Sequence, residues 1–281
     1  MKVLPFKIPK HKKASFVFQI DKESVFYDKL HQHEEIQFSY IVKGSGTLVV
    51  GDTVNYYSKG DVLVIGSNLP HVFKSDRYIE EVSHMLSLFF TKDSFGKEFF
   101  ELEELKSLQH FFKLSSHGFK VTSNKDSFES LFLKLEDASS LERFLILIQL
   151  MNLIPSANSQ SLSSFIYNKR YSAIEGNRMR NVFEYTMDHF HKTITLTDIA
   201  EIANMTQNAF CKYFKKRTNK TYMQFLNELR IESACKALIA NKELTVVEIA
   251  ELSGFNNLSN FNRQFKTLKK ISPSEFRKYS N

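Results

Sequence analysis

A short stretch near the C-terminal end carries polar side chains whose types and spacing suit contact with DNA. In residues 253–277, Phe261 and Phe265 lie four positions apart, and the residues around them are mainly Asn, Ser, Arg and Lys with almost no acid. Asn and Arg can hydrogen-bond base edges in a major groove, and Lys can neutralise phosphate. A helix that only fills a core needs no such second face, so the pattern favours a recognition helix.

The elements that must position these side chains occur twice, because the last ninety residues contain an internal repeat. Ile199 and Ile249 correspond at an offset of 50, whereas Phe210 and Phe261 correspond at an offset of 51. One extra residue therefore lies in the second turn, near Gly254. At about 100° per residue, the polar side chains of both copies fall on the side away from the Phe residues. Each copy is predicted to be a helix-turn-helix unit.

With these motifs the region resembles the DNA-binding domain of the AraC family of bacterial transcription regulators. The signature lies in Gly254-Phe255, in residues 261–266 and in residues 271–277. Residues 225–234 match the helix that joins the two subdomains in that family. The resemblance implies that two recognition helices enter successive major grooves, about 34 Å apart, on one face of the DNA.

The predicted recognition helices span residues 206–216 and 257–269. Cys211 departs from the family pattern, in which a longer polar residue is common, so base reading by the first helix is expected to be weaker. For this thiol, a role as a small filler at the interface is favoured over a redox role. The predicted DNA-contacting residues are Thr206, Asn208, Cys211, Lys212, Lys215, Asn257, Ser259, Asn260, Asn262, Arg263 and Lys266.

The N-terminal part has a different pattern. Residues 14–92 contain short alternating and β-branched runs separated by glycine-containing turns, which predicts hairpin-linked strands in a sandwich or small barrel. The spacing of His31, His33 and the following Gly44, and then of the later Gly and His, resembles the two cupin motifs. The resemblance implies the small β-barrel that serves as the usual N-terminal sensor of the regulator family.

In cupin enzymes two His, an acid and a last His hold a transition metal. This chain keeps the three His, but the position of the acid holds Gln37, and a neutral amide is a poor ligand for iron or manganese. Metal binding, a structural role and contact with a small-molecule effector all stay open for these His, with effector contact favoured. The predicted effector-binding residues are His31, His33, Gln37, Tyr40 and His71. No catalytic residue, metal ligand or cofactor is assigned.

Composition and charge limit the class of protein. The 281 residues are 42% hydrophobic and 25% charged, as in soluble globular proteins, and two Cys cannot form a disulfide framework. No signal peptide or membrane-spanning run is evident, so a cytoplasmic location is expected. Residues 178–281 hold 17 Lys and Arg against 10 Asp and Glu, which accounts for the whole net charge of +7. This asymmetry suggests that the C-terminal part meets a polyanion.

The predicted fold is multidomain α+β. It consists of a cupin-like β-barrel (1–92), a helical dimerisation or linker segment (93–176) and an all-α domain with two helix-turn-helix subdomains (177–281). The middle segment carries apolar residues at helical spacing, which suit either packing against the barrel or a dimer seam. These residues are Phe128, Leu131, Phe132, Leu135, Leu141, Phe144, Leu145 and Ile148.

The resulting hypothesis is a transcription regulator, not an enzyme, that binds double-stranded DNA. The expected partners are a small-molecule effector such as a sugar, a second copy of the chain in a homodimer and, as a further candidate, RNA polymerase; no membrane partner is expected. One alternative is a metal-dependent cupin enzyme with a DNA-binding tail, against which Gln37 argues. The other is an architectural protein without sequence preference, against which the polar residues other than Lys on both helices argue.

Overall fold

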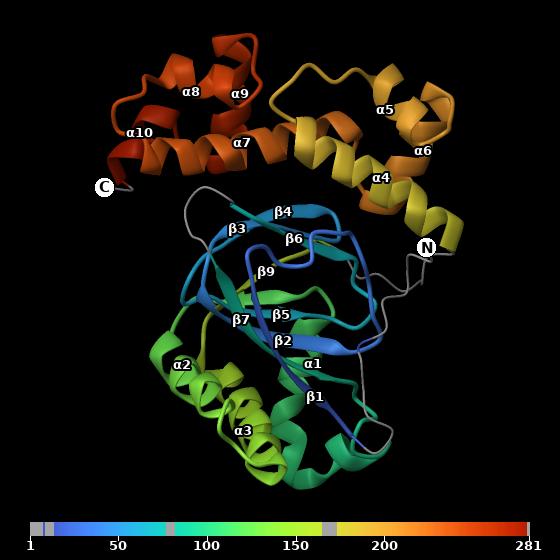
Figure 1. Cartoon of the computed structure of the whole chain (residues 1–281), viewed down its shortest axis with the longest axis vertical. Coiled ribbons are helices and arrows are strands. Elements are labelled where there is room, and N and C mark those ends of the chain that lie inside the picture. Colours follow the sequence, from blue (N-terminus) through green and yellow to red (C-terminus); the bar gives the residue numbers. More distant parts are fainter. Residues whose placement is uncertain (1–7, 9–13, 77–81, 165–172, 280–281) are drawn as a thin grey trace. The chain divides into compact units, whose positions relative to one another are not determined.

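The computed structural model describes residues 8, 14–76, 82–164 and 173–279, and it divides into two compact units, 1–176 and 177–281 (Figure 1). Each unit has its own hydrophobic core and is described separately below. Within the described residues, no helix is both long enough and apolar enough to cross a membrane.

Two antiparallel sheets form the β-rich part of the first unit, as the cupin resemblance predicts. The six-stranded sheet has the order β1 (Val17–Glu23), β7 (Ser83–Phe90), β2 (Ile36–Lys43), β5 (Val62–Ile65), β8 (Phe119–Val121) and β9 (Ser159–Ser161). The three-stranded sheet has the order β4 (Thr53–Tyr57), β3 (Gly46–Val50) and β6 (His71–Ser75). A buried cluster that includes Leu48, Phe73 and Met85 takes its residues from both sheets.

Strand β2 shows how the alternation of side chains sorts residues between two environments. Gln37 and Ser39 point to the barrel interior, where the amide nitrogen of Gln37 lies 4.0 Å from the Met85 sulfur. Phe38 and Tyr40 point to the opposite face, where both rings pack against Phe132. One strand therefore lines the barrel with polar groups and supplies aromatic rings to a second core.

Helices cover that second face of the six-stranded sheet (Figure 1). They are α1 (Gln109–Ser115), α2 (Lys125–Lys134) and α3 (Ser140–Leu153), with short 3-10 turns at Phe99–Glu101, Glu103–Leu108 and Ile154–Ser156. Phe128, Phe132 and Leu135 are fully buried here, whereas Leu141 and Leu145 on α3 are 68% and 49% exposed. The segment predicted as purely helical also contributes β8 and β9, which extend the barrel sheet beyond β5.

The second unit is all helical, as predicted. Its helices are α4 (Ala173–His189), α5 (Leu196–Ile202), α6 (Gln207–Thr218), α7 (Tyr222–Ala240), α8 (Val246–Leu252), α9 (Leu258–Lys269) and α10 (Pro273–Tyr279). In Figure 1 the 19-residue α7 joins the α5–α6 pair at one end to the α8–α9 pair at the other. Phe210 and Phe214 are fully buried in the first pair, as are Phe261 and Phe265 in the second. The two copies of the sequence repeat thus bury equivalent Phe residues.

Candidate nucleic-acid interface and barrel site

The turns of the two helix-turn-helix pairs have the same backbone hydrogen bonds. In the first turn, the amides of Asn204 and Met205 donate to the carbonyls of Glu201 and Ala200. In the second, those of Gly254 and Phe255 donate to the carbonyls of Glu251 and Ala250. The cap of the following helix is then Thr206 in one copy and Asn257 in the other. The extra residue expected near Gly254 is therefore Asn256, between the shared turn and the cap.

Both recognition helices present an exposed polar face that lacks Asp and Glu. On α6, Asn208, Lys212 and Lys215 are exposed, whereas Cys211 is only half-exposed. Neither Lys212 nor Lys215 forms an ion pair with any residue that the structure describes, so both ammonium groups are available for phosphate. On α9, four of the predicted DNA-contacting residues are exposed, namely Ser259, Asn262, Arg263 and Lys266.

The first turn of α9 is organised by its own side chains. The Asn257 side-chain oxygen accepts a hydrogen bond from the Asn260 amide at 2.9 Å, which caps the helix. The Asn260 side-chain oxygen in turn accepts one from an Arg263 Nη2 at 2.9 Å. The guanidinium is thereby held beside the helix while its other donors stay exposed. On α6, Thr206 is likewise the cap and accepts from the Ala209 amide.

A buried arginine fixes the second helix-turn-helix pair against the loop that follows α4. Arg230, in the middle of α7, donates hydrogen bonds of 2.8 Å to the carbonyls of Phe190 and Lys192, and its guanidinium lies over the Phe255 ring. Gly254 approaches the same place with a φ of +86°, and a Cβ on it would lie 2.5 Å from the Phe190 oxygen. Sequence reasoning missed this junction. The available signal was an Arg within the apolar stripe of α7.

In the first unit, the structure brings the three predicted histidines together. His31 and His71 form an isolated β-bridge, with reciprocal backbone hydrogen bonds of 3.0 and 2.8 Å. The His31 and His71 rings are 4.2 Å apart between centroids, and the His33 and His71 rings 5.0 Å. Burial lowers the pKa of His33, and burial and then the neighbouring imidazoles of His31 and His33 hold the pKa of His71 well below its usual value. These two rings are therefore neutral near pH 7.

Gln37 lies beside the histidines, whereas Tyr40 lies on the other face of the sheet. The prediction of Tyr40 as an effector contact is therefore corrected. The Tyr40 hydroxyl donates a 2.6 Å hydrogen bond to Glu129 on α2, on the helix-covered face of the sheet. The reason is the alternation along β2, which sends residues three apart to opposite faces. His31 and Gln37 line a hollow of about 60 Å³ together with Asp21, Phe73 and other residues. Small-molecule pockets usually measure about 300–1,000 Å³, so this hollow is smaller than most of them.

Comparison with known protein families supports both predicted domains. A family described as a helix-turn-helix domain matches residues 199–279, and a family described as a cupin domain matches residues 17–77. The two matches place a cupin domain ahead of the helix-turn-helix region that carries the AraC signature. This is the pair of domains that the AraC resemblance predicts.

Relatives of this chain are named as regulators and not as enzymes. The chain is 29% identical over 108 residues to "Uncharacterized HTH-type transcriptional regulator YdeC" of Bacillus subtilis, which is 38% of this chain and 37% of that protein. It is 28% identical over 111 residues to "Uncharacterized HTH-type transcriptional regulator SAS0078" of Staphylococcus aureus, which is 40% of this chain and 15% of that protein. The chain thus spans well under half the length of these relatives.

Similar solved structures include the AdpA DNA-binding domain in complex with a target DNA, at 23% identity and a TM-score of 0.34. That match covers 35% of this chain and 87% of the AdpA chain. ToxT from Vibrio cholerae matches at 14% identity and a TM-score of 0.37, over 94% of this chain and 97% of its own. Scores this low carry no argument about the whole fold.

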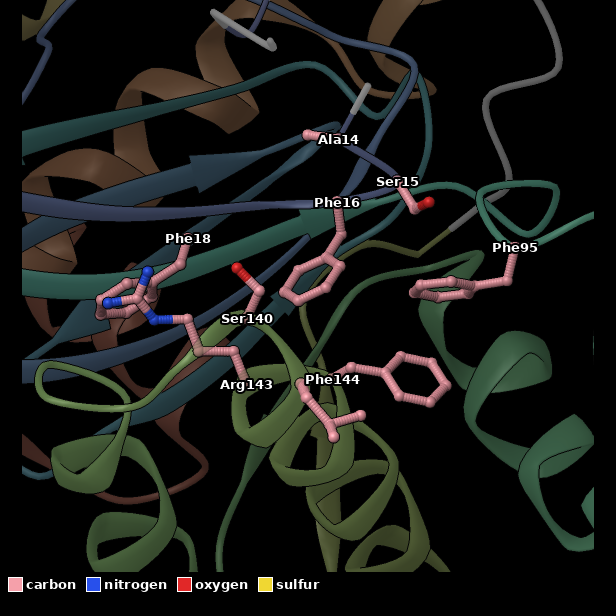
Figure 2. Close-up of a pocket in the computed structure, with 9 residues that line it drawn as sticks. Ala14, Ser15, Phe16, Phe18, Phe95, Ser140, Arg143 and Phe144 are labelled. Atoms are coloured by element: carbon pink, nitrogen blue, oxygen red, sulfur yellow. The ribbon is translucent and has the colours of Figure 1, made fainter. Parts of the chain in front are cut away.

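The first unit has a second, larger hollow on the outside of the barrel, with a volume of about 500 Å³. Figure 2 shows its lining, in which Phe16 and Phe18 come from the β1 region and Phe144 from α3. The Arg143 guanidinium lies over the Phe18 ring, 4.7 Å from its centroid, and donates to the carbonyls of Leu135 and Glu136. The charged group of this hollow is thus already engaged by the protein.

Proposed function

We propose that this chain is a sequence-specific DNA-binding transcription regulator of the cytoplasm. The observation that carries the proposal is the pair of recognition helices. Their turns have the same backbone hydrogen bonds, each helix buries two Phe residues at equivalent positions, and both exposed faces lack acidic residues. On α9, Asn and Arg side chains suit base edges, whereas the unpaired Lys side chains on α6 suit phosphate.

Helix α7, which connects the two helix-turn-helix pairs, supports binding to two successive grooves. Helix α7 has 19 residues, which corresponds to a length of about 28 Å. The Arg230 junction fixes the second pair relative to the loop after α4. Successive major grooves on one face of B-DNA are about 34 Å apart, a distance that two pairs at the ends of such a helix can match.

The barrel is the expected sensor, and His31, His33, Gln37 and His71 are the expected contacts with its effector. The proposal also includes a homodimer. It is supported by Leu141 and Leu145, which lie one helical turn apart and exposed on α3. On α2, Phe128 and Phe132 are buried, and Leu133 is 43% exposed. Sedimentation of the full chain tests this part, because a dimer through α3 should dissociate in a Leu141→Gln/Leu145→Gln variant. A wild-type monomer would contradict the dimer.

Selection of bound sequences from a random duplex pool, with full-length protein at near-physiological salt, tests the main proposal. One enriched motif with two contacted blocks about one helical turn apart is the expected result. The selection is then repeated with residues 177–281 alone. Salt-sensitive binding without any enriched motif in both selections would contradict sequence-specific regulation and favour an architectural protein.

A further inference from the structure

The larger hollow of the first unit has an aromatic wall. The centroid of the Phe95 ring lies 5.9 Å from that of Phe16 and 4.9 Å from that of Phe144. Phe18 continues the wall along β1 (Figure 2). All four side chains pack against the core or its edge, yet each is only half-buried. The rings therefore leave apolar surface at the hollow, and such surface often marks a ligand site.

The hollow also has the size and composition of a small-molecule site. Its volume of about 500 Å³ falls within the range of about 300–1,000 Å³ that is usual for such pockets. Small-molecule sites are mostly apolar and carry a few polar groups that orient the ligand. Here the side chains that supply polar groups are Ser15, Ser140 and Arg143.

Arg143 keeps one edge of its guanidinium free. Its Nε donates to the Leu135 carbonyl at 2.9 Å and its Nη2 to the Glu136 carbonyl at 3.1 Å, which occupies the side edge of the group. A guanidinium has five N–H donors, and the other three have no partner among the residues that the structure describes. One N–H of Nη1 and one of Nη2 form the end edge, which can bind both oxygens of a carboxylate.

The positive charge of Arg143 is also left without a counter-charge in the described part of the chain. No Asp or Glu is among the described lining residues, and Arg143 forms no ion pair with a described residue. The neighbouring Glu142 uses its carboxylate to accept from the Ser139 amide at 2.7 Å. The guanidinium is thus a fixed cation beside aromatic surface. It suits a ligand that is anionic at one end and apolar at the other.

We propose that this hollow binds a small aromatic carboxylate. The carboxylate pairs with the end edge of Arg143, and the aromatic ring packs against Phe16, Phe95 and Phe144. An aromatic body is favoured over an aliphatic one because stacked and edge-to-face ring pairs are stabilised beyond the area that they bury. The site lies outside the barrel interior, involves none of the barrel histidines and does not depend on the proposed DNA-binding function.

Calorimetric titration of the full-length protein with 2-naphthoate as the probe tests the proposal. One probe molecule is expected to bind per chain. The neutral isostere 2-naphthamide should bind at least about 10-fold more weakly, because it cannot form the charged pair with Arg143. Decahydro-2-naphthoate keeps the charge but has no aromatic ring, and it should bind about 3- to 10-fold more weakly. Equal affinity for the amide or for the saturated acid would overturn the assigned ligand class.

Ser140, an exposed residue in the first turn of α3, offers a matched pair of variants. In Ser140→Glu the new carboxylate can reach Arg143, three residues on, and compete for its free edge. The affinity for 2-naphthoate should fall at least about 10-fold in Ser140→Glu and less than about 3-fold in Ser140→Gln. An acid in the first turn of a helix is favourable, so both variants should fold, which circular dichroism checks. Equal affinities in the two folded variants would contradict the proposal.

Methyl NMR of leucine-labelled wild type locates the bound probe. Leu141 lines the hollow, whereas Leu145 is not among its described lining residues, so the largest shift is expected at Leu141. The other candidate occupant is a second copy of the chain, since Leu141 also belongs to the proposed dimer surface. Probe binding only in the Leu141→Gln/Leu145→Gln variant would mean that the second copy fills the hollow and would overturn the proposal. No binding by the folded wild type, or shifts only at distant leucines, would overturn it as well.

Discussion

At equivalent positions of the two recognition helices, α6 has Cys211 and α9 has Asn262. The thiol is half-buried and the amide is exposed. On the inner side of the same helices, Phe210 and Phe261 are both fully buried against their own cores. The two copies thus share the residues that pack and differ at several of the positions that face outward.

We infer from this difference that the copies meet the same folding requirement and would have different tasks on DNA. Helix α9 offers Asn262 and an Arg263 that Asn260 already orients, which suits base reading. Helix α6 offers Lys212 and Lys215 without acidic partners, which suits phosphate contact. We therefore expect α9 to supply most of the sequence preference and α6 to supply register and affinity.

The largest effect is expected at the turn, where the copies differ in their tolerance of a side chain. In Gly254→Ala, the alanine would have to adopt a φ of +86°. Its Cβ would lie 2.5 Å from the Phe190 oxygen and 2.9 Å from the Arg230 Nε. Strain and overpacking together should cost about 2–4 kcal/mol. Amide hydrogen exchange followed by mass spectrometry can measure the loss in α8 and α9 separately from the barrel.

Asn204→Ala is the matched control, because Asn204 occupies the same turn position of the first copy with a φ of +51°. Its Cβ is already accommodated, so the cost should be no more than about 1 kcal/mol. Equal destabilisation by both changes would mean that the junction with Phe190 and Arg230 contributes nothing.

Much of the C-terminal unit could be predicted from sequence because its signals are local. Phe residues four apart give the buried edge of each recognition helix, and Thr206 and Thr245 cap the starts of α6 and α8. The Arg230 junction could not be predicted, since its partners are backbone carbonyls 38 and 40 residues away. Backbone acceptors have no signature in a sequence.

The barrel was predicted less completely, for reasons that differ from strand to strand. β8 and β9 have three residues each, and only their pairing with β5 and with each other makes them strands. The convergence of His31 and His71 followed from motif spacing, but the hydrogen bonds that fix their tautomers depend on loop carbonyls. Tyr40 could have been placed correctly, because strict alternation from Gln37 sends it to the other face.

A second test compares Arg263→Ala on α9 with Lys212→Ala on α6. Loss of an arginine that contacts a base should cost about 1–3 kcal/mol in specific binding and relax the preference at one position of the site. Loss of the lysine should weaken binding to all sequences alike and reduce the slope of log affinity against log salt by about 1. Fluorescence anisotropy with the selected site and a scrambled duplex, over a salt series, measures both effects.

The proposed division of tasks predicts that the two variants give different patterns. If Arg263→Ala lowered affinity for the selected and scrambled duplexes equally, Arg263 would be a phosphate contact. If Lys212→Ala changed the preferred sequence, α6 would read bases as well. Unchanged affinity and preference in Arg263→Ala would remove that residue from the interface.

The smallest effect is expected at Cys211 and Asn262, which occupy equivalent positions of α6 and α9. Asn262→Ala should cost about 1 kcal/mol of specific binding, as expected for loss of a hydrogen bond to a base. Cys211→Ala should change specific binding by less than about 0.5 kcal/mol, because a half-buried thiol is a weak donor that mainly fills space. Cys211→Asn would give α6 the amide that α9 has, and repeating the selection with this variant should sharpen the preference in the first block. A preference that stays the same in that block would mean that α6 does not approach the bases closely enough for any side chain at this position to read them.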